Sequence, residues 1–309
     1  MGTRKLIIRT ILLLGIMTVF IIAYGTSEKS NISIQDKLIH LTKNIQLKDS
    51  EKSESELSST NAILVRLTDN KIVEEKDSQE VIYPASLTKI MTTLVAIESI
   101  SNVKERVILP DSMFTRLYEE NASMAGYLPN EEIAAIDLLY GIMLPSGAEA
   151  SVGLATYIAG SEESFVQLMN EKAEQLGMDN THFTNVTGLH NPDHYTTVKD
   201  LSILLKVALK NDTFRTIFTA ERYSTSPTNL HPDGITFKST MFKNIGTNEL
   251  DNGQIIGGKT GYTEEAGLCL ASLAEINGEE YILITTGAPG NHQTEQFNIT
   301  DALLVYGEL

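Results

Sequence analysis

The sequence predicts an α/β fold in which an antiparallel sheet is flanked by helices and a helical lobe is inserted between its strands. Three observations predict this fold. A pair of strand-like segments stands just after residue 60, a long helical block fills the middle of the chain, and strand-like segments return before a last helix. We therefore expect both ends of the domain to complete one sheet. A cleft between the sheet and the lobe is the natural place for a ligand.

The first strand pair is predicted over 62–67 and 71–75, with Asp69-Asn70 as the turn between them. The next element is a helix that begins near Pro84, since proline is tolerated at a helix entry. Apolar residues at helical spacing give this helix a stripe to bury, and they are Ile90, Met91, Leu94, Val95 and Ile97.

The remaining elements follow from periodicity and from stop signals such as Gly177. Helical patterns cover 131–143, 147–159, 162–176 and 198–210, and a final helix is predicted over 293–306. Strand-like patterns cover 106–109, 234–239, 253–258, 266–275 and 280–287.

The amino terminus has the pattern of an export signal. Basic residues at positions 4, 5 and 9 precede an apolar run over 11–24. We interpret 1–25 as a signal peptide or an amino-terminal membrane anchor, and both alternatives stay open. Either one places the rest of the chain outside the cytoplasm. Residues 26–58 have the composition of a polar linker, so the folded domain is predicted over 59–309.

Composition excludes some functions. The formal net charge of −16 argues against a nucleic-acid surface, which needs clusters of basic residues. The single cysteine, Cys269, cannot form an intrachain disulfide and lies in an apolar run. We predict a buried, inert thiol.

The candidate nucleophile is Ser86. Lys89 follows it three residues later at the start of the predicted helix, so the hydroxyl and the amine face the same side. The amine can then take the hydroxyl proton, as in serine–lysine hydrolases. The spacing alone has little weight, because Ser101 and Lys104 repeat it where the helix ends. We predict that this second pair is solvated.

Two further stretches strengthen the interpretation. One is the Ser146-Gly147 loop between two predicted helices, and the other is Lys259-Thr260-Gly261, predicted to end a strand and begin a turn. The three motifs in this order, together with the segments around 83–92 and 188–201, resemble the serine D-alanyl-D-alanine carboxypeptidases, which are low-molecular-weight penicillin-binding proteins. The resemblance runs from Ala62 to the carboxyl terminus and implies the β-lactamase/penicillin-binding fold.

The resemblance implies a mechanism. Ser86 would attack the peptide bond between two D-alanines of a peptidoglycan stem peptide and form an acyl-enzyme. Lys89 would be the general base, with its pKa lowered by burial and by the positive charge of Lys259. Ser146 would relay a proton toward the leaving amine. The backbone N–H groups of Ser86 and Tyr262 would form the oxyanion hole.

The resemblance also implies the ligands. Lys259 and Thr260 would bind the substrate carboxylate, and Gly261 would let the strand backbone lie against the substrate. β-Lactam antibiotics would acylate Ser86 and act as inhibitors. No metal or organic cofactor is implied. Relatives often carry a further β-rich domain and a carboxyl-terminal membrane helix. We recognise neither pattern in this sequence, so we expect the protein to be attached to the membrane through its amino terminus.

One position departs from the family pattern. The middle motif usually has asparagine at its third position, where this chain has Ala148. A methyl group cannot hydrogen-bond the substrate, and such a loss typically lowers a rate by roughly tenfold to a hundredfold. Glu149 is adjacent but is expected to point elsewhere on a helix.

Other functions remain open. A D,D-endopeptidase or transpeptidase would use the same residues, and a weakly active protein that binds β-lactams or cell-wall stems would fit Ala148. A β-lactamase would need an added carboxylate for fast deacylation, which we cannot place from sequence. A metal hydrolase would rest on His190 and His194, but Pro192 between them prevents a regular helix.

Overall fold

The computed structural model describes residues Leu57–Leu309. The predicted signal or anchor over 1–25 and nearly all of the predicted linker lie outside the described residues. Within residues 57–309, no helix combines the length and the apolar character that a membrane crossing requires.

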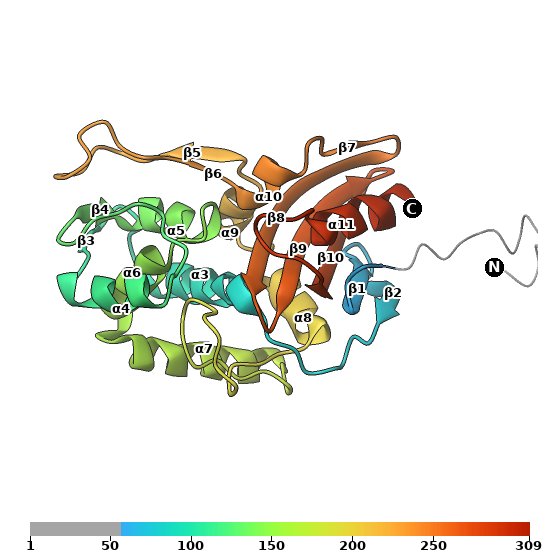
Figure 1. Cartoon of the computed structure of the whole chain (residues 1–309), viewed down its shortest axis with the longest axis horizontal. Coiled ribbons are helices and arrows are strands. Elements are labelled where there is room, and N and C mark those ends of the chain that lie inside the picture. The colour runs from blue at the N-terminus through green and yellow to red at the C-terminus, as the bar shows by residue number, and fades with distance from the viewer. Residues whose placement is uncertain (1–56) are drawn as a thin grey trace, which may run out of the picture. The chain divides into compact units, whose positions relative to one another are not determined.

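The centre of the fold is a six-stranded antiparallel sheet (Figure 1). Its strand order is β2-β1-β10-β9-β8-β7. Strand β1, the first along the chain, therefore pairs with β10, the last. The prediction that both ends of the domain complete one sheet is confirmed. The strands are β1 (Asn61–Arg66), β2 (Lys71–Lys76), β7 (Glu249–Leu250), β8 (Gly253–Thr263), β9 (Gly267–Ile276) and β10 (Glu279–Ala288).

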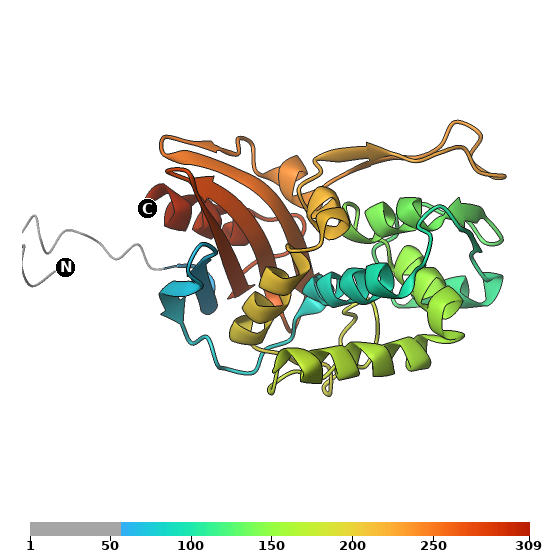
Figure 2. The same ribbon diagram turned by 180° about the vertical axis from the view of Figure 1, so that it is seen from behind.

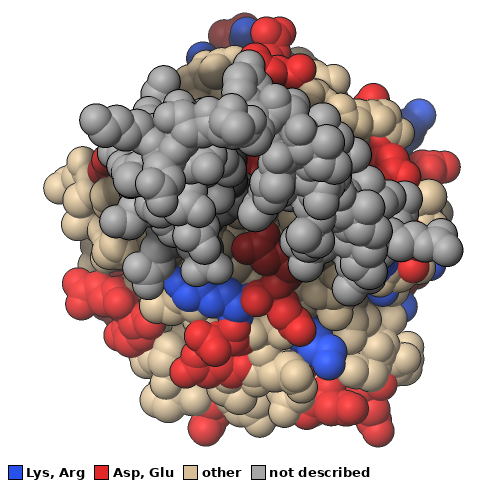
Figure 3. All heavy atoms as spheres, turned by 90° about the vertical axis from the view of Figure 1, so that its right-hand side faces the viewer, with Lys and Arg blue, Asp and Glu red and all other residues tan. Residues whose placement is uncertain are grey.

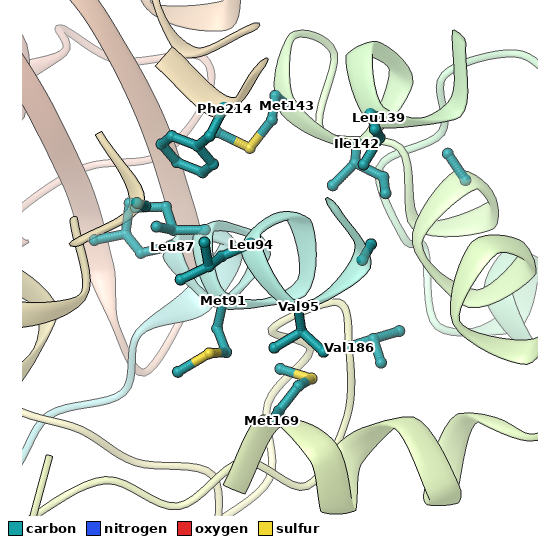
Figure 4. Packing of buried hydrophobic residues seen from close by; sticks show 14 of the residues in the cluster. Leu87, Met91, Leu94, Val95, Leu139, Ile142, Met143, Met169, Val186 and Phe214 are labelled. Atoms are coloured by element: carbon teal, nitrogen blue, oxygen red, sulfur yellow. The ribbon is translucent and has the colours of Figure 1, made fainter. Parts of the chain in front are cut away.

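The helical lobe lies on one side of the sheet and is built around one helix, α3 (Thr88–Ser99) (Figure 2). Every residue of α3 from Thr88 to Ala96 is buried. Figure 4 shows its apolar side chains packed among residues from the surrounding helices. These helices are α4 (Phe114–Glu119), α5 (Ala135–Met143), α6 (Ala148–Ala159), α7 (Glu162–Leu176), α8 (Val198–Ala208) and α9 (Asp212–Phe218). Two short 3-10 turns precede α3 and α4, namely η1 (Ala85–Leu87) and η2 (Asp111–Met113).

The helices predicted over 147–159 and 162–176 are confirmed, and two other predictions need correction. The predicted helix 131–143 begins as strand β4 (Glu132–Ala134), which pairs with β3 (Arg106–Ile108) and buries Ile133 against the lobe. The predicted strand 234–239 is the shorter β6 (Thr236–Lys238), which pairs with β5 (Arg222–Ser224) in a hairpin separate from the main sheet. Helix α10 (Thr240–Asn244) then leads into the sheet.

The last helix, α11 (Phe297–Gly307), packs on β9 and β10 and starts four residues later than predicted. Its Asp301 is buried and joins the two ends of the described chain. The Asp301 carboxylate accepts hydrogen bonds from the Ser58 N–H at 2.9 Å, the Ser59 N–H at 2.8 Å and the Ser59 hydroxyl at 2.6 Å. The face drawn in Figure 3 carries more Asp and Glu than Lys and Arg, in keeping with the net charge of −16.

We predict that Asp301→Asn lowers the free energy of unfolding by about 1–3 kcal/mol, because an amide NH₂ would face a buried N–H donor in place of a carboxylate oxygen. Urea unfolding measures the change. Thr300→Ala is the matched control, since Thr300 is the exposed neighbour on the same helix. Equal unfolding midpoints for Asp301→Asn and Thr300→Ala would contradict the prediction.

Candidate active site

Ser86 lies in η1, and Lys89 lies in the first turn of α3. The predicted helix start is therefore a 3-10 turn that continues into an α-helix. Ala85, just before Ser86, has a φ of +46°, which is the left-handed region that L-residues rarely adopt. The three-residue spacing nevertheless brings the two side chains together, because Lys89 Nζ donates a hydrogen bond to Ser86 Oγ at 3.2 Å.

Lys89 has almost no contact with water and is 2% exposed. Its amine also donates to the backbone oxygen of Thr187 at 2.6 Å. Burial lowers the pKa of Lys89 to about 7, although the negative charge of Glu149 acts in the opposite direction. Near pH 7 the Lys89 amine is therefore neutral in a large fraction of the molecules, as a general base requires.

A second buried lysine lies close by. Lys259 is in β8, and its Nζ donates to Ser146 Oγ at 2.9 Å and to the Thr260 backbone oxygen at 2.8 Å. Burial lowers the pKa of Lys259 well below 10.5, and the positive charge of Lys89 adds to the effect. The sequence predicts that Lys259 lowers the pKa of Lys89. Burial is the main cause of the lowered Lys89 pKa, and the repulsion between the two ammonium groups disfavours the charged form of both.

The Lys259-Thr260-Gly261 motif does not end a strand, since β8 continues to Thr263. Gly261 faces η1, because a Cβ added there would lie 3.1 Å from Ser86 N. Its missing side chain thus lets the sheet and the nucleophile turn approach each other. The Thr260 hydroxyl shares a hydrogen bond with the Thr240 hydroxyl at 2.6 Å. Along its outer side β8 pairs with β7 only at its first residues, so no strand within residues 57–309 pairs with that edge around Lys259.

A cavity of about 490 Å³ opens beside Ser86, a size that suits a small ligand. It lies between the lobe and the end of β8, which confirms the predicted cleft. Its lining includes Ser86, Lys89, Asn121 and Ala148 from the lobe, and Tyr262 and Thr263 from β8. Lys259, Ser146, Thr260 and Gly261 are not among its lining residues.

Glu149 has a structural role that sequence reasoning missed. Its side chain is fully buried, and one carboxylate oxygen accepts backbone N–H groups from Ala125 at 2.7 Å, Gly126 at 2.8 Å and Tyr127 at 3.2 Å. The Ala148 N–H donates to the Ser123 backbone oxygen at 2.8 Å. Together these bonds hold the loop over 120–127 against the start of α6. No local sequence signal indicates this, because the loop and the helix are distant along the chain.

Sequence reasoning also missed the acceptor for Lys89. Asn185 accepts the N–H groups of Thr187 and Gly188, at 3.1 and 2.7 Å, and so shapes the turn that presents the Thr187 carbonyl. The Asn185 side-chain amide donates to the Leu189 backbone oxygen at 2.9 Å. An asparagine shortly before a glycine is a turn signal and could have located this segment.

The alternatives to the Ser86 site find little support. His194 is buried and hydrogen-bonded to Thr88, and His190 pairs with Glu265 at 3.6 Å. Within residues 57–309, no group of three or more His, Cys, Asp or Glu side chains is placed to hold a metal ion. The second Ser-x-x-Lys pair, at 101 and 104, is exposed, as predicted. Cys269 is buried, and burial raises the pKa of its thiol to about 12, as expected for an inert thiol.

Comparison with known proteins gives consistent results. The profile of the D-alanyl-D-alanine carboxypeptidase family matches residues 48–290. The chain is 37% identical over 251 residues to D-alanyl-D-alanine carboxypeptidase DacF of Bacillus subtilis, covering 78% of this chain and 61% of DacF. It is 31% identical over 249 residues to the D-alanyl-D-alanine endopeptidase of Escherichia coli, covering 78% of this chain and 74% of that protein. The chain thus spans about three fifths of the length of DacF.

The structure resembles the crystal structure of the Streptomyces K15 DD-transpeptidase, with a TM-score of 0.72 and 26% sequence identity. The similarity covers 82% of this chain and 98% of that one, so the β-lactamase/penicillin-binding fold expected from the sequence is confirmed. Through its matched profile, its relatives and its fold, the chain belongs to the D-alanyl-D-alanine carboxypeptidase family.

Proposed function

We propose that this chain is a serine D,D-carboxypeptidase that removes the terminal D-alanine from peptidoglycan stem peptides through an acyl-enzyme. The observation that carries the proposal is the hydrogen bond from Lys89 Nζ to Ser86 Oγ beside a cavity, with burial lowering the pKa of Lys89 to about 7. A buried amine of this kind can activate a serine at neutral pH. The family profile and DacF, itself named a D-alanyl-D-alanine carboxypeptidase, support the substrate class.

Acylation begins when neutral Lys89 takes the hydroxyl proton of Ser86. The bond from Ser86 Oγ to the carbonyl carbon forms, and the carbonyl oxygen becomes an oxyanion. The backbone N–H groups of Ser86 and Tyr262 are the proposed donors to this oxyanion. Both residues line the cavity, as this role requires.

The tetrahedral intermediate then breaks at its carbon–nitrogen bond. The leaving amine of D-alanine needs a proton, and Ser146 is the proposed relay because its hydroxyl bonds the buried amine of Lys259. The remaining peptide stays on Ser86 as an ester. Water adds to this ester, Ser86 recovers its proton and the shortened peptide leaves. A β-lactam acylates Ser86 in the same way, and its ester hydrolyses slowly.

The substrate lies along the edge of β8 around Lys259 in this proposal, since an extended peptide can hydrogen-bond the edge of a strand. The terminal carboxylate favours the protonated form of Lys259, which then binds it, and the Thr260 hydroxyl donates to it. The Thr260 hydroxyl can do so while it accepts the hydrogen bond that it shares with the Thr240 hydroxyl. Gly261 contributes by permitting the close approach of β8 to Ser86.

We place the enzyme in the cell envelope, with residues 1–25 as its signal peptide or membrane anchor. The basic and apolar pattern of that segment supports the placement. Proteins of this family act on a substrate outside the cytoplasm, which also requires export. No metal or organic cofactor takes part in the proposed reaction.

A second candidate is a D,D-transpeptidase or endopeptidase. The names of two similar proteins favour it, namely the Streptomyces K15 DD-transpeptidase and the Escherichia coli D-alanyl-D-alanine endopeptidase. All these reactions share the acyl-enzyme and differ in the bond attacked or in the final acceptor. Mass analysis of the products with and without an added amine acceptor identifies the transpeptidase, because transfer gives an adduct and hydrolysis gives a free acid. Cleavage of a cross-linked peptide identifies the endopeptidase.

We predict that Ser86→Ala abolishes D-alanine release from a peptide ending in D-Ala-D-Ala, because the nucleophile is removed. Release by the unmodified chain should persist in EDTA, since no metal takes part. Ser101→Ala is the control, as its exposed serine has the same spacing to a lysine. Equal release by Ser86→Ala and the unmodified chain would refute the assigned nucleophile.

The pH dependence of kcat/KM should follow the protonation of the Lys89 amine. The amine must be neutral to accept the proton, and its pKa is about 7. We therefore expect kcat/KM to fall about tenfold for each pH unit below about 7, and to level off above it. A flat profile between pH 5 and about 7 would show that another group is the base.

Ala148→Asn tests the departure in the middle motif. We predict a rise in kcat/KM of roughly tenfold, because the amide adds a hydrogen bond to the substrate from a residue that lines the cavity. Ala148→Leu is the control, since leucine has the same branched shape as asparagine, with larger methyl groups in place of the polar atoms. A gain from leucine as large as that from asparagine, or no gain from asparagine, would contradict the prediction.

A further inference from the structure

His194 is a buried histidine that the proposed reaction does not use. It is 2% exposed, lies outside the cavity lining, and its ring packs edge-on against Phe183 at 5.5 Å between centroids. Both ring nitrogens nevertheless have hydrogen-bond partners. One of these partners, Thr88, is the first residue of α3 and directly follows the turn that carries Ser86, so the histidine is connected to the nucleophile.

The direction of each hydrogen bond is determined by its partners. The Thr184 backbone N–H can only donate, and it lies 3.1 Å from His194 Nδ1, so Nδ1 accepts. In the neutral ring the hydrogen then sits on Nε2, which donates to the Thr88 hydroxyl at 2.8 Å. The Thr88 hydroxyl donates in turn to the Ala85 backbone oxygen at 2.8 Å, which also accepts the Thr88 backbone N–H. Burial lowers the pKa of His194 to about 3, which keeps the ring neutral.

Gly188 closely approaches the Ala85 carbonyl. A Cβ added to Gly188 would lie 1.8 Å from the Ala85 oxygen, so no other residue fits there. Ala85 itself has a φ of +46°, a conformation that L-residues rarely adopt. The two hydrogen bonds from Thr88 keep the turn in this strained form.

The orientation of this one carbonyl also determines the orientation of the Ser86 N–H. Ala85 O and Ser86 N belong to the same planar peptide, which is trans, so the N–H points away from the carbonyl. The carbonyl points toward Thr88 and Gly188. The N–H is therefore directed to the other side of the peptide, where β8 approaches and the added Cβ of Gly261 would lie 3.1 Å from Ser86 N.

We propose that His194 is a positioning residue for the reaction at Ser86. Through the Thr88 hydroxyl it holds the Ala85 carbonyl and thereby aims the Ser86 N–H at the developing oxyanion. This inference rests on the proposed function, because it takes Ser86 as the nucleophile and its N–H as an oxyanion donor. A small rotation of this donor should affect the transition state more than substrate binding.

The experiment measures acylation of the full chain by a penicillin, from the mass of the quenched protein over a range of concentrations. This separates the acylation rate constant from the dissociation constant of the non-covalent complex. Thr88→Val removes the hydroxyl and keeps the shape, and we expect the rate constant to fall roughly tenfold to a hundredfold with the dissociation constant unchanged. Thr88→Ser keeps the hydroxyl and should restore the rate to within about threefold of the unmodified chain.

Thr92→Val is the matched control. Thr92 lies one turn further along α3, and its buried hydroxyl donates to the Val186 backbone oxygen at 2.8 Å without contacting Ala85. The Thr92→Val variant should lose stability as Thr88→Val does, but its acylation rate constant should equal that of the unmodified chain. His194→Phe keeps an aromatic ring and should reproduce the Thr88→Val defect. The double variant that combines Thr88→Val and His194→Phe should be acylated no more slowly than either single variant, since both changes break the same chain of hydrogen bonds.

The outcomes are distinguishable. Equal acylation rates for Thr88→Val and Thr88→Ser, or defects of Thr88→Val and His194→Phe that multiply in the double variant, would overturn the positioning role alone. A raised dissociation constant with an unchanged rate constant would also overturn it. Absence of acylation at Ser86 in the unmodified chain would overturn the proposed function, and this inference with it.

Discussion

Two lysine amines held out of water are the constraint on which the rest of the site depends. An isolated ammonium group in a protein interior is strongly disfavoured, so burial shifts both amines toward the neutral form. Each amine is satisfied in the same manner, by one serine hydroxyl and one backbone carbonyl. In the described part of the chain neither amine bonds a carboxylate that would hold its proton in place. The amines can therefore exchange protons with the serines beside them.

This constraint explains why the site lies where the sheet meets the lobe. One serine–lysine pair comes from the start of α3, and the other joins a lobe loop to β8. Neither the sheet nor the lobe alone could bury both amines. The close approach at Gly261 brings the two structural parts into contact, and the nucleophile turn lies at that contact. Packing between the sheet and the lobe thus determines the chemistry as well as the stability.

The loops around the cavity are held by buried polar groups and not by apolar packing alone. Glu149 gathers three backbone N–H groups of one loop, and Asn185 organises the turn that faces Lys89. His194 and Thr88 act in the same way on the turn before Ser86. Such bonds are worth more in a dry interior than in water, and a missing partner leaves a buried group unsatisfied. They give the cavity a defined shape although most of its wall is irregular chain.

The sequence by itself determined what depends on residues close together in the chain. The Ser86–Lys89 pair follows from one helical turn, the strands and most helices follow from periodicity, and the family follows from three short motifs. Only the tertiary structure decided what depends on residues far apart. Thr187 reaches Lys89 across 98 positions and Ser146 reaches Lys259 across 113, and no local pattern encodes either contact. The pKa shifts, the left-handed turn at Ala85 and the packing reason for Gly261 belong to this second group, because burial and close approach are properties of the folded surroundings and not of the residue.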